Sequence, residues 1–385
     1  MRLAYVTETF PPELNGVALT VKRTVRHLRE RGHAVDLIRP RQPADPQDAG
    51  RSEWLTSGWP IPMYADLRFG FATAGALRRR FEQSRSDLVH IATPGPLGWE
   101  ALRAARALNL PTTSDFRTNF HLYSRHYRLG AFAAVVLGAL RWFHNHSDRT
   151  FVPTRAGARD LERNGFRNLA VIGRGVDTTV FDPARRSAEL RRTWRAADGA
   201  PVLLSVGRIA AEKNIALALR TFETVRQREP KAQMVVVGDG PLRGALESAH
   251  PDVRFIGTRT GEALAACYAS ADLFVFPSLT ETFGNVTLEA LASGLPVVAF
   301  DRAAAAEHVE HGASGLLVRP GDDLGFVNAA SALGLQPQRL DAMRAAAAAT
   351  AHRVRWEDVL SRFEAQLQDT LDGHQADVAA APVVA

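Results

Sequence analysis

Short apolar runs alternate with amphipathic segments in the first part of the chain. The segments Leu3–Thr7 and Ala34–Arg39 have the length and the side chains of buried strands. Between them, Val17–Arg31 repeats its apolar positions with the period of a helix, and Gly32 is a typical residue to follow a helix end. Strand, helix and strand in succession predict a parallel sheet with helices on both faces.

The same alternation extends through the first half of the chain and begins again in the second half. Further buried strands are predicted in the first half at Leu88–Ile91, Thr112–Asp115, Phe151–Thr154 and Ala170–Ile172. In the second half they are predicted at Val202–Val206, Gln233–Val237, Arg254–Ile256, Leu273–Phe276 and Val297–Ala299, with helices such as Ile215–Arg228 and Thr287–Ser293 between them. Residues 41–62 predict an excursion loop, and residues 175–200 predict a polar connector.

This pattern predicts an α/β protein with two doubly wound domains, and the length of 385 residues fits two domains of ordinary size. We expect the first domain at residues 1–180 and the second at 181–353. A C-terminal helix at about 354–372 is expected to pack back onto the first domain, and residues 373–385 are expected to form a flexible tail. Because such sheets bind ligands at the carboxyl ends of their strands, the expected active site is a central cleft that both domains face.

The composition is that of a folded protein, with 46% hydrophobic and 23% charged residues. Cys267 is the only cysteine, so no disulfide can form within the chain and a reducing compartment is expected. A strand-like segment follows Met1 directly, in place of a signal peptide. The longest apolar run, near Ala131–Leu140, is well short of the ~20 residues that a membrane span needs. We therefore expect a cytoplasmic protein.

The formal charge of +6 is unevenly distributed along the chain. Residues 1–180 hold 26 Lys and Arg against 16 Asp and Glu, whereas the remaining residues hold 21 against 25. A basic first half favours an anionic partner such as a phospholipid surface, and it equally fits a solvated arginine-rich face. An apolar stripe with helical spacing lies in this half, beside Arg125 and Arg128: Phe132, Val135, Val136, Ala139, Trp142 and Phe143. This stripe predicts either peripheral contact with the inner face of a membrane or packing on the domain's own sheet.

The strongest candidate site is the segment Glu281–Glu289, which follows a predicted strand and leads into a helix. Gly284 permits close backbone approach, and the N–H groups at a helix start carry partial positive charge that can hold a phosphate. The N–H groups concerned are those around Phe283, Gly284 and Asn285. Glu281 could accept hydrogen bonds from a transferred sugar, and Glu289 from a ribose. Two glutamates alone also fit a capping carboxylate and a surface residue.

A second group follows the strand Val202–Val206. Gly207 leaves space at the strand end, and Arg208 and Lys213 can converge on one anion. A diphosphate leaving group would need that charge as its bond breaks. Since the chain holds only three lysines, we favour a functional role for Lys213 over that of a solvated surface residue.

Weaker candidates follow other predicted strands. Gly16 stands before a helix and could let a phosphate approach the backbone. His121 follows the strand Thr112–Asp115 and could hydrogen-bond a sugar or stabilise developing positive charge. Gly257 and Thr258 could offer backbone groups to a nucleobase. If His121 stood alone, a structural role would be favoured, and Gly16 alone is a weak signal, because a glycine before a helix is common.

Taken in this order, these segments resemble the family-four glycosyltransferases with the GT-B fold, from Ala4 to about Pro320. The stretch Pro277–Ala299 and the residues Gly207-Arg208 with Glu212-Lys213-Asn214 carry the resemblance to the family. Within it, Glu8–Val17 and Asp115–His121 are similar to bacterial α-mannosyltransferases that use GDP-mannose and act on lipid or glycan acceptors. Sulfoquinovosyl and glucosyl transferases to diacylglycerol are similar too.

The resemblance implies a role for each candidate residue. Arg208 and Lys213 would bind the donor diphosphate without a metal ion or other cofactor, and Glu289 would bind the ribose. Glu281, with the amides of Phe283 and Gly284, would bind the transferred sugar. Gly16 would approach the phosphate and His121 the sugar. The first domain would bind the acceptor, and transfer would retain the anomeric configuration. The sequence departs from the family pattern at Asn285-Val286-Thr287, where leucine and valine are commoner.

Three other functions stay open at this point. The first is a UDP-sugar-dependent glucosyl or sulfoquinovosyl glycolipid synthase. The second is a nucleotide-sugar epimerase, although such enzymes lack the pairing of Arg208 and Lys213 with the segment Glu281–Glu289. The third is a carbohydrate- or nucleic-acid-binding protein, which the basic first half favours slightly. Nucleic acid is not expected, because aromatic residues are not interleaved with the arginines as on a base-stacking surface.

Overall fold

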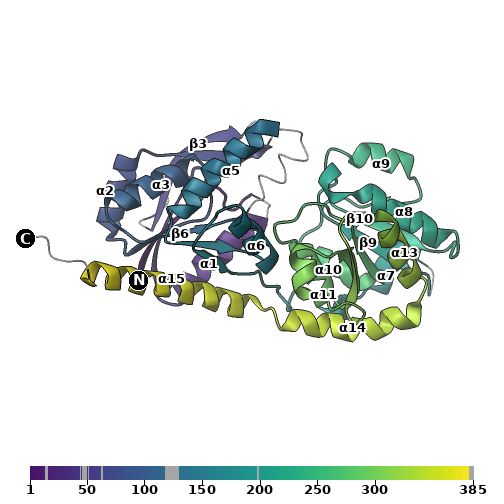
Figure 1. The fold of residues 1–385 in the computed structure, drawn as a ribbon. Coiled ribbons are helices and arrows are strands. Elements are labelled where there is room, and N and C mark those ends of the chain that lie inside the picture. Colours follow the sequence, from purple (N-terminus) through teal and green to yellow (C-terminus); the bar gives the residue numbers. More distant parts are fainter. Residues whose placement is uncertain are drawn as a thin grey trace, which may run out of the picture. The chain divides into compact units, whose positions relative to one another are not determined.

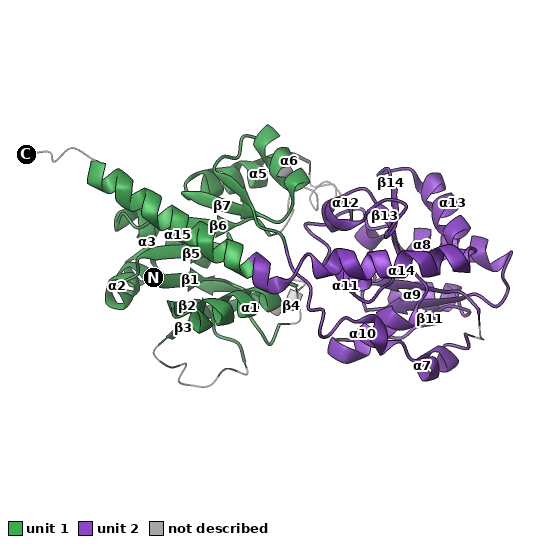
Figure 2. Cartoon of the chain, turned by 90° about the horizontal axis from the view of Figure 1, so that it is seen from below, with its two compact units in different colours: residues 1–173, 360–385 green, residues 174–359 purple. Residues whose placement is uncertain are grey.

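The computed structural model describes residues 1–13, 16–43, 45, 50, 52–61, 64–117, 130–196 and 199–380. The chain divides into two units. Unit 1 comprises residues 1–173 and 360–385, and unit 2 comprises residues 174–359 (Figure 2). The boundary thus lies a few residues before the one expected at residue 180, and the end of the chain returns to unit 1.

Among the described residues, unit 1 contains an eight-stranded sheet in the order β4-β3-β2-β1-β5-β6-β7-β8 (Figure 1). Its strands are β1 Arg2–Val6, β2 Ala34–Pro40, β3 Glu53–Ile61, β4 Tyr64–Phe71, β5 Leu88–Ile91, β6 Thr112–Asp115, β7 Arg149–Val152 and β8 Leu169–Val171. Its helices include α1 Gly16–Glu30, α2 Ala74–Ser84, α3 Pro96–Ala107, α5 Gly130–Asn145 and α6 Arg155–Arg163. All strand pairs are parallel except β3 with β4.

The prediction of an excursion loop at residues 41–62 is wrong for its second part. β3 begins at Glu53, pairs in parallel with β2 from Leu37↔Glu53 to Pro40↔Thr56, and then forms an antiparallel ribbon with β4. The sheet edge at β2 offers unpaired backbone groups, and hydrogen bonding to them outweighs a composition rich in turn formers. Composition alone does not reveal that such an edge is available.

Unit 2 contains, within its described residues, a six-stranded parallel sheet in the order β11-β10-β9-β12-β13-β14. Its strands are β9 Val202–Val206, β10 Gln233–Val237, β11 Arg254–Phe255, β12 Leu273–Phe276, β13 Val297–Phe300 and β14 Gly315–Val318. Its helices include α7 Ala188–Thr193, α8 Ile215–Arg226, α9 Arg243–Ala249, α10 Gly261–Ser270, α11 Asn285–Ala292, α12 Ala303–His308, α13 Asp323–Gly334 and α14 Pro337–His352.

The core of unit 2 lies on both faces of this sheet. Leu204 and Phe274 belong to one buried cluster, while their neighbours Leu203 and Leu273 belong to the other. Successive strand residues point to opposite faces, so strands covered on both sides are apolar at most positions. This explains why the predicted strands of unit 2 have largely apolar sequences and agree with the structure to within a residue.

The last helix, α15 (Trp356–Ala380), belongs to unit 1 from Leu360 onward (Figure 2). Its buried side chains Phe363, Leu367 and Leu371 share a core cluster with Leu3 and Leu28 of β1 and α1. The C-terminal helix therefore completes a hydrophobic core that β1 and α1 form in part.

A carboxylate on α15 joins this helix to three basic residues near α1. Glu364 lies 2.8 Å from Nε2 of His33 and 3.3 Å from Nε2 of His27, and it accepts a hydrogen bond of 3.2 Å from Arg31. These contacts hold the pKa of Glu364 below its ordinary value. The group is partly exposed, so we regard it as an aid to the position of α15 rather than as a major source of stability.

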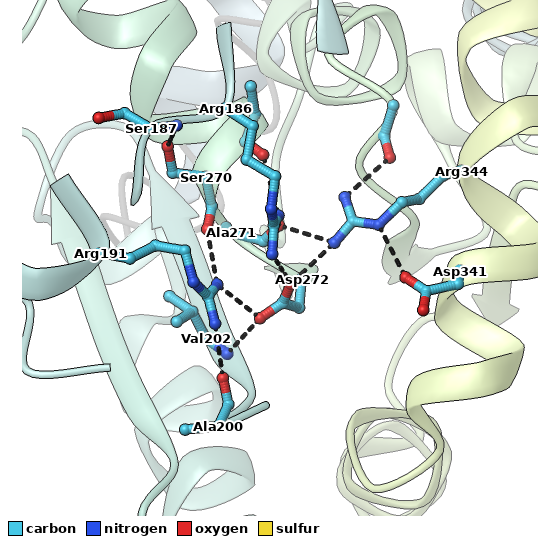
Figure 3. A network of polar contacts seen from close by, with 12 residues as sticks. Arg186, Ser187, Arg191, Ala200, Val202, Ser270, Ala271, Asp272, Asp341 and Arg344 are labelled. Atoms are coloured by element: carbon cyan, nitrogen blue, oxygen red, sulfur yellow. Dashed lines mark hydrogen bonds and ion pairs between the residues drawn. The ribbon is translucent and has the colours of Figure 1, made fainter. Parts of the chain in front are cut away.

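A second polar network lies inside unit 2 and is centred on Asp272, directly before β12 (Figure 3). Its carboxylate accepts hydrogen bonds from Arg186 at 2.8 Å, Arg191 at 2.9 Å and Arg344 at 2.7 Å. It also accepts one of 2.9 Å from the backbone N–H of Val202, at the start of β9. The three guanidinium groups hold the pKa of Asp272 below its ordinary value.

The same arginines donate to backbone carbonyls around the carboxyl end of α10. Arg186 donates to the carbonyls of Ala269 and Ala271, and Arg191 donates to that of Ser270. The carboxyl end of a helix presents unpaired carbonyls with partial negative charge. The arginines therefore satisfy these carbonyls in addition to the carboxylate of Asp272. The segment predicted as a polar connector is thereby fixed to α10, β9 and β12.

The network gives a prediction for stability. Asp272→Asn leaves three inward-facing guanidinium groups without their shared counter-charge, so we expect the free energy of unfolding of unit 2 to fall by about 3–5 kcal/mol. Amide hydrogen exchange of β9 and β12 peptides in urea measures unit 2 separately from unit 1. The matched control is Asp341→Asn, which removes an exposed carboxylate 3.2 Å from Nε of the same Arg344. An effect of equal size in the two variants would contradict the central role of Asp272.

Candidate functional site

Several residues of unit 2, some of them predicted as site residues, follow three strands that are neighbours in its sheet. β9 leads to Gly207 and Arg208, β12 leads to Ser278 and Glu281, and β13 leads to Arg302. Since β9, β12 and β13 are adjacent and parallel, their carboxyl ends lie on one edge of the sheet. This is the edge at which doubly wound sheets bind ligands.

Lys213 and Glu281 form the centre of this group. The ammonium group of Lys213 forms an ion pair with Oε1 of Glu281, and Ser278 donates a hydrogen bond of 2.7 Å to the same oxygen. Lys213 also lies over the ring of Phe276, 5.9 Å from its centroid. The two segments are joined through the backbone, because the N–H of Leu279 donates to the carbonyl of Glu212 at 2.9 Å. The structure thus brings together two residues that are 68 positions apart.

Arg208 lies beside this pair and is 45% exposed. Its Nη1 atom is 4.0 Å from Oε1 of the buried Glu212. A guanidinium held at that distance by a carboxylate and open to solvent can turn toward an arriving anion at little cost. Arg208 and Lys213 therefore place two cations near the carboxyl end of β9.

The helix start that follows Glu281 is shaped by Gly284. Its φ of +90° is a conformation that other residues rarely adopt, and a Cβ atom there would lie 3.5 Å from the Glu281 side chain. Phe283 is buried, and its carbonyl accepts a hydrogen bond of 2.7 Å from the N–H of Ala304. Asn285 is the first residue of α11, where backbone N–H groups have no partner within the helix. The turn therefore presents N–H donors beside the Glu281 carboxylate.

Arg302 is a further cation at this site that the sequence analysis missed. It follows β13 directly, and burial lowers its pKa while the charge of Glu281 raises it. This electrostatic link places its guanidinium within range of the Glu281 carboxylate. The signal in the sequence was a charged pair, Asp301 and Arg302, at the end of a fully apolar strand.

Glu289 lies one turn inside α11 and accepts a hydrogen bond of 3.0 Å from the hydroxyl of Tyr268. Burial raises the pKa of Glu289 to about 7, and the bond from Tyr268 opposes that rise. The sequence analysis did not single out Tyr268, because an aromatic residue inside a predicted helix carries no sign of a polar role. The pair forms a second polar position at the site, besides that of Glu281.

Gly257 and Thr258 follow β11, and they adjoin the turn after β10. The N–H of Gly238 donates to the carbonyl of Gly257 at 3.0 Å. A Cβ atom on Gly238 would lie 1.9 Å from the carbonyl oxygen of Gly207, so this turn needs a glycine to pass so close to the β9 end. Thr258 is exposed. The ends of β9, β10 and β11 thus form one continuous backbone surface.

The two remaining candidates belong to unit 1. Gly16 is the first residue of α1, after β1, and is exposed. His121 lies outside the described residues. The carboxyl end of β1 also carries Glu8, which accepts a hydrogen bond of 2.9 Å from the N–H of Leu97 in the first turn of α3. Burial raises the pKa of Glu8 to about 7.

Comparison with known proteins identifies the family. A family model described as "Glycosyltransferase Family 4" matches residues 14–180, and one described as "Glycosyl transferases group 1" matches residues 200–334. The GDP-mannose-dependent alpha-mannosyltransferase of Mycolicibacterium smegmatis is 35% identical over 322 residues, which are 83% of this chain and 84% of that protein. The chain belongs to glycosyltransferase family 4.

Two further similarities are more distant. The sulfoquinovosyl transferase SQD2 of Arabidopsis thaliana is 30% identical over 83% of this chain and 64% of its own length. A crystal structure of Anabaena HepE in complex with UDP superposes with a TM-score of 0.74 at 18% identity, over 96% of this chain and 100% of that one. The GT-B fold, with two Rossmann-like units, and the assignment of the chain as a glycosyltransferase are both confirmed. None of the described helices is long and apolar enough to cross a membrane.

The raised pKa of Glu289 predicts a pH-dependent stability. A carboxyl with an ordinary pKa near 4.5 in the unfolded chain and about 7 in the fold takes up a proton on folding between these values, so its contribution to stability falls as pH rises through this window. The melting temperature of Glu289→Gln, measured without nucleotide, should therefore fall less between about pH 5 and pH 8 than that of the wild type. Glu8 still titrates in the variant, so the slope shrinks but does not vanish. Glu262→Gln, which changes an exposed glutamate on α10, should keep the wild-type slope; an unchanged slope in Glu289→Gln would contradict the raised pKa.

Proposed function

We propose that this enzyme transfers a mannosyl group from GDP-mannose to a lipid or glycan acceptor, with retention of the anomeric configuration. The observation that carries the proposal is the convergence of Arg208, Lys213 and Glu281 beside the start of α11. The name of the M. smegmatis relative, which is 35% identical, supports GDP-mannose as the donor. The sulfoquinovosyl transferase among the relatives supports a lipid as one class of acceptor.

The diphosphate of the donor is proposed to bind between the two cationic side chains and the first turn of α11. Arg208 and Lys213 supply positive charge where a metal-dependent transferase would use a divalent ion, and the helix start adds N–H donors. We therefore propose that no metal ion or other cofactor takes part. Arg302 adds a third cation near Glu281, and it remains as a positive charge near this carboxylate when Lys213 turns toward the phosphate.

The sugars of the donor are proposed to bind to the two glutamates. Glu281 accepts hydrogen bonds from hydroxyls of the transferred mannose, and Glu289 accepts them from the ribose, replacing the bond that it receives from Tyr268. Gly257 and Thr258 contact the base through their backbone. Gly16 and His121 stay predictions for the donor phosphate and the sugar.

Retention is proposed to follow from attack on the face that the leaving group departs from. As the bond between the anomeric carbon and the diphosphate oxygen breaks, the acceptor oxygen forms its bond to that carbon on the same side. The departing diphosphate takes the acceptor's proton, so no protein carboxylate is needed as nucleophile. Arg208 and Lys213 stabilise the negative charge that grows on the diphosphate.

A UDP-sugar donor is the alternative that one observation favours, since the structurally similar HepE was crystallised with UDP. A thermal-shift series with GDP, UDP and ADP separates the two. A nucleotide that binds only the folded protein stabilises it by about 2.7 kcal/mol at 100 times its dissociation constant, so GDP should give the largest rise in melting temperature. The rise should disappear in Lys213→Ala. A larger rise with UDP would overturn the proposed donor.

The roles of the cations predict the effect of single substitutions. Lys213→Ala and Arg208→Ala should each lower kcat by about 100- to 1000-fold, because one preorganised donor to a developing anion is worth ~2.7–4 kcal/mol. The assay follows GDP release in excess EDTA, in which the wild type should keep full activity. Lys231→Ala, an exposed lysine of the same unit, is the matched control and should retain wild-type kcat. Near-normal kcat of Lys213→Ala at saturating donor would refute the diphosphate assignment.

We also propose that unit 1 makes peripheral contact with an anionic membrane, which fits a lipid acceptor. The apolar stripe predicted around α5 has one buried part and one exposed part. Phe143 is fully buried in the core of unit 1, whereas Val135 is 67% exposed and Trp142 is 45% exposed. Trp142 stacks on Trp99 of α3, with ring centroids 5.2 Å apart. The exposed half of the stripe, with an aromatic pair at one end, supports contact with a lipid interface; Arg125 and Arg128 lie outside the described residues.

Vesicle co-sedimentation tests this contact. Binding should appear with phosphatidylglycerol vesicles at low salt, be absent with phosphatidylcholine alone, and fade as salt is added. Val135→Glu should weaken it, because a carboxylate on the contacting face is repelled by the headgroups. Leu324→Glu is the matched control, since Leu324 of α13 in unit 2 is also 67% exposed. Equal recovery in the supernatant with both kinds of vesicle would favour a soluble acceptor.

A further inference from the structure

Unit 2 contains a cavity of about 950 Å³ that shares no residue with the site described above. It runs along β11, the edge strand of the sheet, between α7 and α10 and beside the end of α8. Gln233 and Arg254, the first residues of β10 and β11, line it. Arg208, Lys213 and Glu281 do not line it, so it is a separate place for a ligand.

The cavity has an excess of positive charge when the carboxylates that already form ion pairs are left out. Four arginines line it, namely Arg195, Arg226, Arg254 and Arg259, together with the acidic residues Glu189, Glu247 and Asp252. Asp252 pairs with Arg226 at 2.5 Å, and Glu247 lies 3.3 Å from Arg243. Across the described chain, Arg195, Arg254 and Arg259 have no ion pair, so three cations face one remaining carboxylate, Glu189.

The position of Arg254 is fixed by the protein itself. Its Nε atom donates a hydrogen bond of 2.8 Å to the carbonyl of Trp194, which leaves the outer nitrogens of the guanidinium for other partners. The pKa of Arg254 is lowered by burial and by the charge of Arg195, so the two like charges lie within range of each other. Two neighbouring guanidinium groups with no shared carboxylate favour an anion between them.

The walls of the cavity add apolar surface to this charge. Trp194, Phe222, Val253 and Phe255 line it and are largely buried in the fold, so their positions are set by packing. Its volume is within the range of about 300–1,000 Å³ that is usual for sites of small organic ligands. Rigid apolar walls with a few converging cations suit a compact organic molecule that carries a strongly anionic group.

We propose that this cavity is a second ligand site, which binds a phosphorylated small organic molecule through Arg195 and Arg254. A phosphate monoester carries about −1.5 to −2 charges near neutral pH, which matches the excess of cations better than a single carboxylate does. Its oxygens accept paired hydrogen bonds from guanidinium groups. Arg259, which also lines the cavity, adds attraction without a direct contact being required. The proposal does not depend on the identity of the donor nucleotide.

The probe for this site is phenyl phosphate, which combines a phosphate with an apolar ring. Binding is measured by phosphorus NMR titration in the Arg208→Ala, Lys213→Ala double variant, so that the proposed diphosphate site does not contribute. We expect saturable binding, and weaker binding of benzoate, which has the ring and only one negative charge. No saturable binding of phenyl phosphate in the double variant would overturn the proposal.

Substitutions in the cavity make the assignment specific. Arg195→Gln, at an exposed residue, and Arg254→Gln should each weaken phenyl phosphate binding by about tenfold or more, because each removes one of the two converging charges. Arg228→Gln, just beyond the end of α8 and outside the cavity, is the matched control and should bind normally. An unchanged melting temperature of Arg195→Gln separates lost binding from lost structure. Equal affinity in Arg195→Gln and Arg228→Gln would refute the role of the arginine pair.

Discussion

The carboxylate of Asp272 joins several segments of unit 2 through ion pairs and hydrogen bonds. It receives three arginines from distant parts of the chain, Arg186, Arg191 and Arg344, and the N–H of Val202. A cluster of cations around one partly buried anion is stable only while that anion is present, because unpaired charges in a fold are costly. Asp272 also stands directly before β12, so the same interaction fixes the start of the strand whose other end carries the candidate site.

The candidate site also brings cations close to carboxylates, but here they are available to attract an anionic ligand. Lys213 forms an ion pair with the carboxylate of Glu281, Arg302 lies within range of the same carboxylate, and the half-exposed Arg208 lies 4.0 Å from Glu212. Here the group lies at an open strand end. Positive charge in excess of the local carboxylate is what a diphosphate needs, and the start of α11 adds to it. Basic side chains thus stabilise unit 2 around Asp272 and attract an anionic ligand at the candidate site.

Unit 1 depends on an interaction between the two ends of the sequence. Phe363, Leu367 and Leu371 of α15 complete the core around Leu3 and Leu28, and Glu364 adds contacts to His27, Arg31 and His33. Without α15, the apolar face of β1 and α1 would be exposed to water at a cost of roughly 25 cal/mol for each Å². The C-terminal helix is therefore part of the unit that carries the Glu8–Val17 segment.

The sequence by itself determined the parallel sheets, the family resemblance and most of the site. Strands buried on both faces, such as Val202–Val206 and Leu273–Phe276, need apolar residues at most positions, and that requirement can be recognised in the sequence alone. The glycine and charged residues after these strands, from Gly207 to Glu289, were also visible, because chemistry at a strand end needs particular side chains.

Only the tertiary structure decided which distant groups meet. The contacts of Tyr268 with Glu289 and of three arginines with Asp272, and the electrostatic effect of Glu281 on Arg302, join residues that have no periodic relation in the sequence. β3 formed on a sheet edge that composition could not reveal, and the stripe around α5 was divided between buried Phe143 and exposed Val135 by the packing of its neighbours. Burial, hydrogen bonding and pairing of charges depend on spatial neighbours, and chain order does not specify these neighbours.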